Sequence, residues 1–280
     1  MEKKISFIII FFVTALNLYS FDEGFVWALK ANFNGTATLP SISDSDLDKL
    51  GAAYMKGAVG YTMEGEAELG YLFGSKRWFN GMDPSKFSGM SVFASIGVGN
   101  GFAGQVAGNT IEGIEANMYI NVSYSPVISF GVGTKAYFLD SKLALGLHIG
   151  GKLIADLSPE YLAYTDNPQA LEILFQNTPY SLPEIGEIIV TDFMIKNMNP
   201  LMLSLKFMLE YNQPVNDRVE VILGLYTRFN LYSPKYITMP DSLLHALQAN
   251  RPNFTTETPL PSYYINSLDF GLTIGLAFKG

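Results

Sequence analysis

Two residue types that often carry chemistry are scarce in this sequence: cysteine is absent, and only two histidines, His148 and His245, occur. An exported chain without cysteine has no disulfide framework, and without clustered Cys or His side chains we predict no metal site and no cofactor. The formal net charge is −8, so a nucleic-acid partner, which needs a basic surface, is not expected. Beyond residue 20 no apolar run approaches the ~20 residues of a membrane-spanning helix, although 48% of the chain is hydrophobic.

The beginning of the chain predicts an export signal. A charged start at residues 2–4 precedes an apolar run over 5–18, and Ser20 supplies a small residue for cleavage. The run is too short for a dependable spanning helix, and a retained N-terminal anchor helix is the alternative. We therefore expect a signal peptide over 1–20 that is cleaved on export, and a mature domain over 21–280.

The C-terminal segment alternates between two kinds of side chain. Period two predicts a β-strand, because successive side chains point to opposite faces. A small, polar second face suits a strand with lipid outside and a wet lumen inside. At ~3.3 Å per residue and a tilt of ~40°, the strand covers roughly 27 Å of membrane, close to the ~25 Å apolar band of such barrels. The apolar parity holds Leu268, Phe270, Leu272, Ile274, Leu276 and Phe278, and the other holds Asp269, Gly271, Thr273, Gly275 and Ala277.

The same alternation recurs along the chain and predicts an all-β, up-and-down antiparallel transmembrane β-barrel of about ten strands. A turn is expected at Glu64-Gly65 and a break at Ser125-Pro126. Two connections fit less well, because 101–113 is long for a periplasmic turn and Ser125-Pro126 is short for an outer loop. Eight or twelve strands are therefore the alternatives. The expected strands cover 25–33, 53–63, 66–73, 90–99, 114–124, 127–138, 143–154, 201–212, 218–232 and 268–278.

Charged side chains support this register. Those within the expected strands fall on the parity opposite the apolar one, and a Lys or Arg facing mid-bilayer lipid would cost ~2–4 kcal/mol. A soluble β-sandwich also alternates, but its strands are usually only about five or six residues long. We predict that the lumen is lined by Lys30, Lys56, Glu66, Glu68, Glu115, Lys135, His148, Lys152, Lys206, Glu210, Arg218, Glu220, Arg228 and Asp269.

Long connections alternate with short ones, and we expect the long ones at 34–52, 74–89, 156–200 and 233–262 to be outer loops. Helix-start residues such as Asn167 predict short helices near 44–50, 169–176 and 241–249. The apolar faces of these helices either pack together and cap the barrel mouth or form a lid over a site for a lipophilic ligand. The candidates for contact with that ligand are Leu171, Leu174, Phe175, Leu243, Leu244 and Leu247.

The run from Asp269 to Leu276, followed by Phe278, resembles the C-terminal assembly signal of the outer-membrane β-barrel class of diderm bacteria. The chain departs from that pattern because Lys279 and Gly280 follow the aromatic residue. The resemblance covers about residues 24–280 and implies an outer-membrane location, contact with membrane lipid and insertion by the barrel-assembly machinery. The residues that match the signal are Asp269, Gly271, Ile274, Leu276 and Phe278.

The function expected first is a narrow, porin-like channel for small polar solutes, lined by charges of both signs. Glycines on the inward face leave room, whereas a barrel near eight strands is filled by its own side chains. The alternative is a non-channel barrel whose helical outer loops bind a lipophilic or host ligand. A hydrolase at the outer rim is third. His245 follows Asp241 by four residues, but no nucleophile motif can be identified and His148 is expected inside the lumen, so no catalytic residue is predicted.

Overall fold

The architecture was obtained as a computed structural model. It describes residues 23–41, 52–74, 78–79, 83, 85–111, 114–154, 160–165, 167, 169, 187–189, 201–216, 218–232 and 264–279. The regular elements of these residues are β-strands. No helix in this part of the chain has the length and apolar character needed to cross a membrane. The predicted signal peptide, the predicted helices near 44–50 and 241–249, and the helix near 169–176 apart from Gln169 lie outside the described residues.

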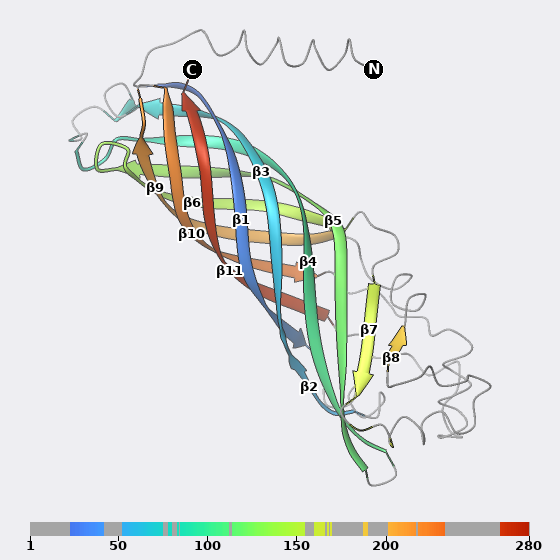
Figure 1. Ribbon diagram of the computed structural model, residues 1–280. Coiled ribbons are helices and arrows are strands. Elements are labelled where there is room, and N and C mark those ends of the chain that lie inside the picture. Colours follow the sequence, from blue (N-terminus) through green and yellow to red (C-terminus); the bar gives the residue numbers. More distant parts are fainter. Residues whose placement is uncertain are drawn as a thin grey trace, which may run out of the picture.

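Eight strands close into an antiparallel up-and-down barrel (Figure 1). Each strand pairs with the next barrel strand along the chain, and the last pairs with the first from Ser41↔Tyr264 to Val26↔Lys279. Because every barrel strand has two partners, the barrel has no free edge, as a membrane-spanning sheet requires. Its members are β1 (Gly24–Ser41), β3 (Val59–Gly74), β4 (Gly89–Ile111), β5 (Ile114–Phe138), β6 (Leu143–Ile154), β9 (Leu201–Pro214), β10 (Val219–Tyr232) and β11 (Tyr264–Lys279).

The predicted count of ten strands was wrong, because two expected interruptions do not divide the sheet. β3 runs through Glu64-Gly65, where Glu64 is buried in the interior and pairs with Arg228 instead of forming a turn. β5 likewise runs through Ser125-Pro126. β4 extends to Ile111, so the long turn expected over 101–113 is mostly strand. The eight-strand alternative is the observed one.

The end of the barrel where β1 begins and β11 ends is called the proximal end. Short turns at 139–142 and 215–218 join β5 to β6 and β9 to β10 there. β3 and β4 also meet at this end, where Gly74 pairs with Gly89. The prediction of an outer loop over 74–89 was therefore wrong. Short turns on the side of the chain termini are the periplasmic arrangement of outer-membrane barrels.

At the opposite, distal end the sheet continues beyond the barrel. β4 and β5 are 23 and 25 residues long, and their distal halves pair with each other. β2 (Ala52–Gly57) pairs with β4 on one side, and β7 (Glu160–Thr165) followed by β8 (Glu187–Ile189) extends from β5 on the other. We call β2, the distal halves of β4 and β5, β7 and β8 the distal sheet (Figure 1).

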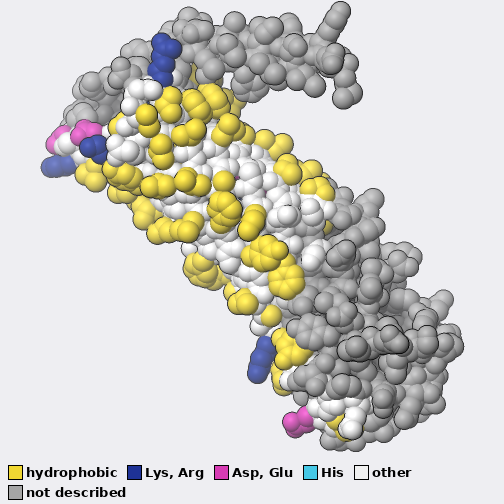
Figure 2. All heavy atoms as spheres, viewed as in Figure 1, with side chains coloured by type: hydrophobic (Ala, Val, Ile, Leu, Met, Phe, Trp, Pro, Cys, Tyr) yellow, Lys and Arg dark blue, Asp and Glu magenta, His cyan; other side chains and the backbone are white. Residues whose placement is uncertain are grey.

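The barrel has an apolar outside and a polar inside. Hydrophobic side chains such as Leu272 (60% exposed) cover the outer surface, and the charged side chains visible on it lie toward its two ends (Figure 2). Aromatic rings gather at the proximal end, where Tyr71 contacts Phe25 and Phe73 at centroid distances of 5.5 and 5.0 Å. Phe73 in turn packs against Trp78 at 5.4 Å. An apolar band ending in an aromatic girdle is the surface that a bilayer requires.

Candidate functional site

Four charged side chains form a closed ring inside the barrel. Lys30 Nζ lies 2.6 Å from Glu68 Oε1 and 2.5 Å from Glu210 Oε1. Lys135 Nζ reaches the remaining oxygens of the same carboxylates, at 2.6 Å from Glu68 Oε2 and 2.9 Å from Glu210 Oε2. The four residues come from β1, β3, β5 and β9, so the ring ties distant parts of the barrel wall together across the lumen.

Further ion pairs fill the interior on the distal side of this ring. Their carboxylates also accept neutral hydrogen bonds, since Asn32 Nδ2 donates to Glu66 at 2.5 Å and Asn230 Nδ2 donates to Asp269 at 2.9 Å. With the ring, five buried cations face five buried anions, so the network carries no net formal charge. The additional pairs are Lys206–Glu66 (2.7 Å), Arg228–Glu64 (2.9 Å) and Lys152–Asp269 (3.0 Å).

Large side chains occupy the room that the inward glycines leave. A Cβ added to Gly271 would lie 2.6 Å from Cε1 of Tyr226, and one added to Gly131 would lie 2.5 Å from Nε2 of His148. Phe93 covers Gly133 in the same way, and Met208 covers Gly146. Phe93, Met208 and Tyr226 also form a buried apolar cluster among the charges. The glycines therefore admit the rings and chains of neighbouring strands rather than a water-filled path.

A small cavity lies next to the ring of Lys30, Glu68, Lys135 and Glu210, toward the proximal end. Its volume is about 30 Å³, and its lining includes Glu68, Lys135 and Glu210 together with Glu220 and Lys279, which form an ion pair. A space of this size holds about one or two water molecules. It ends at the ring, which separates it from the distal half of the interior.

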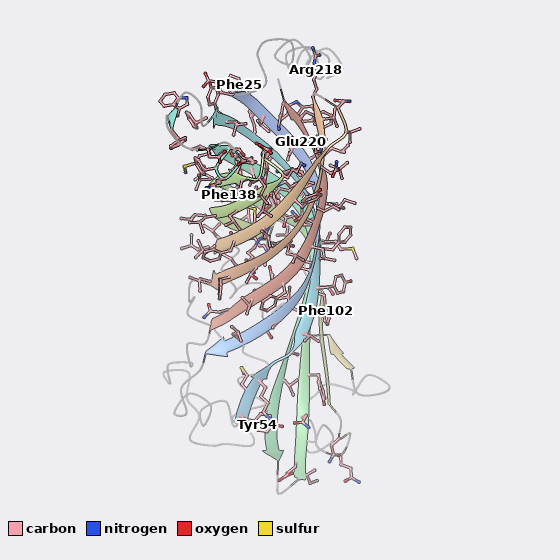
Figure 3. All side chains as sticks on the ribbon, turned by 90° about the vertical axis from the view of Figure 1, so that its left-hand side faces the viewer. Phe25, Tyr54, Phe102, Phe138, Arg218 and Glu220 are labelled. Carbon is pink, nitrogen blue, oxygen red and sulfur yellow. The ribbon has the colours of Figure 1, made fainter. Side chains whose placement is uncertain are left out.

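Most of the residues predicted to line the lumen lie in this buried interior. Three do not: Lys56, Glu115 and Arg218 are exposed and lie outside it. Arg218 belongs to the proximal turn, with its backbone N–H bonded to Asn216 Oδ1 at 2.8 Å (Figure 3). Those in the interior are Lys30, Glu66, Glu68, Lys135, His148, Lys152, Lys206, Glu210, Glu220, Arg228 and Asp269. Glu64 was missed, because Glu-Gly in the middle of a long alternating segment has the composition of a turn.

Lys56 and Glu115 face outward because two irregularities shift the strand register. Between the pairs Gly99↔Val127 and Gly101↔Tyr124, β5 has one more residue than β4, near Ser125-Pro126. This irregularity reverses which residues in the distal half of β5 point outward. Glu115 therefore shares the outer face of the sheet. The regular strand pairing is also interrupted at Ala58. Before it in the chain, Lys56 pairs with Val106, which points to the same side of β4 as the lipid-facing Ile96. A period-two pattern read through either irregularity assigns the wrong face.

The five assembly-signal residues all lie on β11, the strand that closes the barrel against β1. Asp269 and Gly271 belong to the interior, whereas Ile274 and Leu276 are exposed on the lipid side. Phe278 stacks on Trp27 of β1 with a centroid distance of 3.9 Å. The loop candidates Leu171, Leu174, Phe175, Leu243, Leu244 and Leu247, and His245, lie outside the described residues.

His148 lies in the packed interior of the barrel, in contact with Ser95 and Phe93. Its Nε2 lies 2.9 Å from Ser95 Oγ, and its ring stacks on Phe93 at 5.9 Å. In the part of the chain that the structure describes, its buried Nδ1 has no hydrogen-bond partner, so no carboxylate orients the ring. His148 is 4% exposed and so belongs to the buried interior.

A closed β-barrel with an apolar outer surface, buried paired charges inside and short turns at one end is an outer-membrane-type β-barrel. No protein-family model and no curated protein matches the chain. Solved structures of outer-membrane proteins are similar to it. Neisserial surface protein A is 9% identical with a TM-score of 0.31 and coverage of 91% of this chain and 97% of that one. Outer membrane protein OprG from Pseudomonas aeruginosa is 7% identical, with a TM-score of 0.31 and coverage of 91% and 96%. The outer membrane protease OmpT from Escherichia coli is 8% identical, with a TM-score of 0.31 and coverage of 94% and 99%.

Proposed function

We propose that the protein is a non-conducting outer-membrane barrel that holds its distal sheet and outer loops at the cell surface, where they bind a lipophilic or host ligand. The observation that carries this proposal is the filled interior, with five buried cations paired to five buried anions. An eight-stranded barrel has an interior just wide enough for side chains. A solute that entered would have to separate buried ion pairs, and breaking one such pair costs about 3–5 kcal/mol.

The distal sheet supports the second half of the proposal. A strand crosses the membrane with ~9–11 residues, whereas β4 and β5 have 23 and 25. Residues 103–111 and 114–122 lie past the Tyr61↔Phe102 pair with β3 and extend about 30 Å at ~3.3 Å per residue. The outer face of this extension carries polar and aromatic groups. Tyr54 donates a hydrogen bond to Asn117 at 2.5 Å (Figure 3). Lys56 Nζ lies 4.4 Å from the centre of the Tyr54 ring.

The narrow porin-like conduit for small polar solutes is the second candidate. It is supported by the polar character of the interior and by the hydratable cavity at the proximal end. The cavity stops at the ring of Lys30, Glu68, Lys135 and Glu210, so conduction would require that ring to open. A rim hydrolase is a third proposal. It depends on His245, and a peptide and ester substrate panel applied to the wild type and to His245→Ala tests it.

Planar-bilayer recording of the refolded protein tests the proposed function. The wild type is expected to be silent over a wide voltage range. The variant Lys30→Ala/Lys135→Ala/Glu68→Ala/Glu210→Ala removes the ring but leaves the distal ion pairs in place, so any conductance that it gains over the wild type shows that the ring contributes to the closure of the lumen. Steady conductance through the wild type contradicts a non-conducting barrel and supports the conduit. A heat-modifiable gel shift checks that each variant is folded.

A further inference from the structure

The lipid-facing surface of the barrel carries a groove that crosses six strands. It occupies about 970 Å³, within the range of sites for small apolar molecules. Its floor is the backbone of one continuous row of residues that crosses the strands. The side chains of these residues point into the barrel, so only their backbone faces the membrane. The row runs Thr62, Asn34, Gly271, Tyr226, Met208, Gly146, each residue paired with the next.

The walls of the groove are the two adjacent rows of outward side chains. These wall residues are exposed to between 41% and 60% where they are large and apolar, so the groove opens to the membrane and not to the lumen. One wall is Met63, Phe33, Leu272, Leu225, Leu209 and Leu145, and the other is Tyr61, Gly35, Phe270, Thr227 and Phe207.

Two features make this groove wider than an ordinary gap between rows. A Cβ added to Gly35 would have no heavy atom within 4 Å, so the second wall falls to the backbone there. Thr227 adds only a short side chain to the same wall. The pairing across these six strands is regular, whereas register shifts occur between β2 and β4 and between β4 and β5. The rows therefore stay aligned across β3, β1, β11, β10, β9 and β6.

The groove crosses the strands at right angles, and since barrel strands tilt by ~35–45°, it runs obliquely at roughly 45–55° to the membrane normal. Six strands at ~4.8 Å spacing give it a length of about 24 Å. It begins near Tyr61 at the distal end of β3 and finishes near Leu145 at the proximal end of β6. The walls are two residues apart on each strand, or about 6.6 Å. This spacing is common to all neighbouring outward rows of the barrel, so the extra room of the groove comes from the low second wall at Gly35 and Thr227.

We propose that an acyl chain of an outer-leaflet lipid occupies the distal half of this groove, with its headgroup near Tyr61. The groove is continuous with the surface that the bilayer already covers, and the polar groups that its wall side chains carry outward are the hydroxyls of Thr227 and Tyr61. Tyr61 stacks on Phe102 at 6.1 Å at the distal end, where an aromatic ring with a hydroxyl suits the headgroup level. Within the membrane, attraction between apolar groups comes from close van der Waals packing. A groove contacts an acyl chain on three sides, whereas a smooth surface contacts it on one.

Photo-crosslinking in vesicles tests this proposal with a phospholipid that carries a diazirine in its acyl chain. Cross-linked residues are mapped by mass spectrometry of the wild-type protein. Phe33, Leu225 and Leu272 are expected to be labelled about threefold more than Val132 and Ile96, because extra carbon contacts lengthen the residence of the chain. Val132 and Ile96 are 61% and 58% exposed on strands outside the groove, so they correct for simple access to lipid.

Two double variants complete the experiment. Leu225→Ala/Leu272→Ala lowers one wall and is expected to reduce the labelling of Phe33 to the level of the controls. Ile96→Ala/Val132→Ala removes similar side chains elsewhere and is expected to leave it unchanged. Even labelling of all lipid-facing residues in the wild type overturns the proposal. Labelling of the groove residues below that of the controls also overturns it, and is the result expected if a second copy of the chain covers the groove. Neither result depends on whether the barrel conducts.

Discussion

The ring of Tyr226 lies across Gly271 of the neighbouring strand, and its hydroxyl donates a hydrogen bond to Asn34 Oδ1 at 2.9 Å. The same ring is placed between two cations, with Lys206 Nζ 4.7 Å and the Arg228 guanidinium carbon 5.5 Å from its centre. Tyr226 therefore fills space, completes a hydrogen bond and contacts two members of the ion-pair network. This arrangement exists only because residue 271 has no side chain.

Gly271→Val is expected to destabilise the barrel by about 1–3 kcal/mol, because the added carbons overlap the phenol ring and force it from its packed position. Urea unfolding in lipid vesicles, followed by intrinsic fluorescence, measures the loss. Gly35→Val is the matched control: it adds the same group on an adjacent strand where nothing lies within 4 Å, and it should change stability by less than about 0.5 kcal/mol.

The double variant Gly271→Val/Tyr226→Ala separates overlap from a general intolerance of valine at this position. Removal of the ring relieves the overlap, so the penalty of Gly271→Val should be smaller in the Tyr226→Ala background than in the wild type. Equal penalties in the two backgrounds would mean that Tyr226 does not occupy the space over Gly271.

The ring of Lys30, Glu68, Lys135 and Glu210 predicts a strong effect of removing one cation. Lys135→Met leaves two buried carboxylates with one lysine between them and should cost about 3–5 kcal/mol of unfolding free energy. Lys135→Met/Glu210→Gln restores the balance of charge and should recover a substantial part of this loss. Lys56→Met, at an exposed position on β2, is the control and should stay within about 0.5 kcal/mol of the wild type. A Lys135→Met protein as stable as that control would contradict a paired, buried ring.

Thr38 of β1 links the barrel to the beginning of the distal sheet. Its hydroxyl donates to the Gly104 carbonyl at 2.5 Å and accepts from the Ala58 N–H at 2.9 Å, at the point where β2 leaves the ladder. Thr38→Val keeps the shape but removes these two bonds, and since the Ala58 N–H also donates to the Gly104 carbonyl at 3.2 Å, the cost should be about 0.5–1.5 kcal/mol. Hydrogen exchange should become faster in β2 and distal β4 while β9–β11 stay protected. Uniform acceleration throughout the barrel would show that Thr38 supports global stability instead.

The sequence pattern predicted the barrel, its closing strand and the polar character of its interior, because period two and charge avoidance of lipid are local properties of each strand. It could not reveal the register shifts at Ala58 and near Ser125-Pro126, since an extra residue leaves the composition of a strand unchanged while exchanging its faces. Lys56 and Glu115 were misplaced for this reason.

The sequence pattern also could not predict which of the interior charges form ion pairs with each other. Arg228 and Asp269 are neighbours across β10 and β11, yet their ion pairs cross the lumen: Arg228 pairs with Glu64 on β3, and Asp269 pairs with Lys152 on β6. Cross-strand neighbours follow from pairing order, whereas contacts across a lumen depend on the stagger and closure of the whole barrel. The filling of inward glycines by Tyr226, His148 and Phe93 depends on the same three-dimensional arrangement.

The stacking of Phe278 on Trp27 joins the last strand to the first, with an interplanar angle of 11°. Phe278→Ala removes this contact at the closing seam and should destabilise the barrel by about 0.5–1.5 kcal/mol beyond the loss of buried area. Trp27 and Trp78 are the two tryptophans of the chain, so the emission of a Trp78→Phe protein reports on Trp27 alone. In that background Phe278→Ala should shift Trp27 emission, whereas Leu276→Ala, at the preceding lipid-facing position of β11, should leave it nearly unchanged. An identical shift in both variants would mean that Trp27 senses the strand as a whole and not the ring of Phe278.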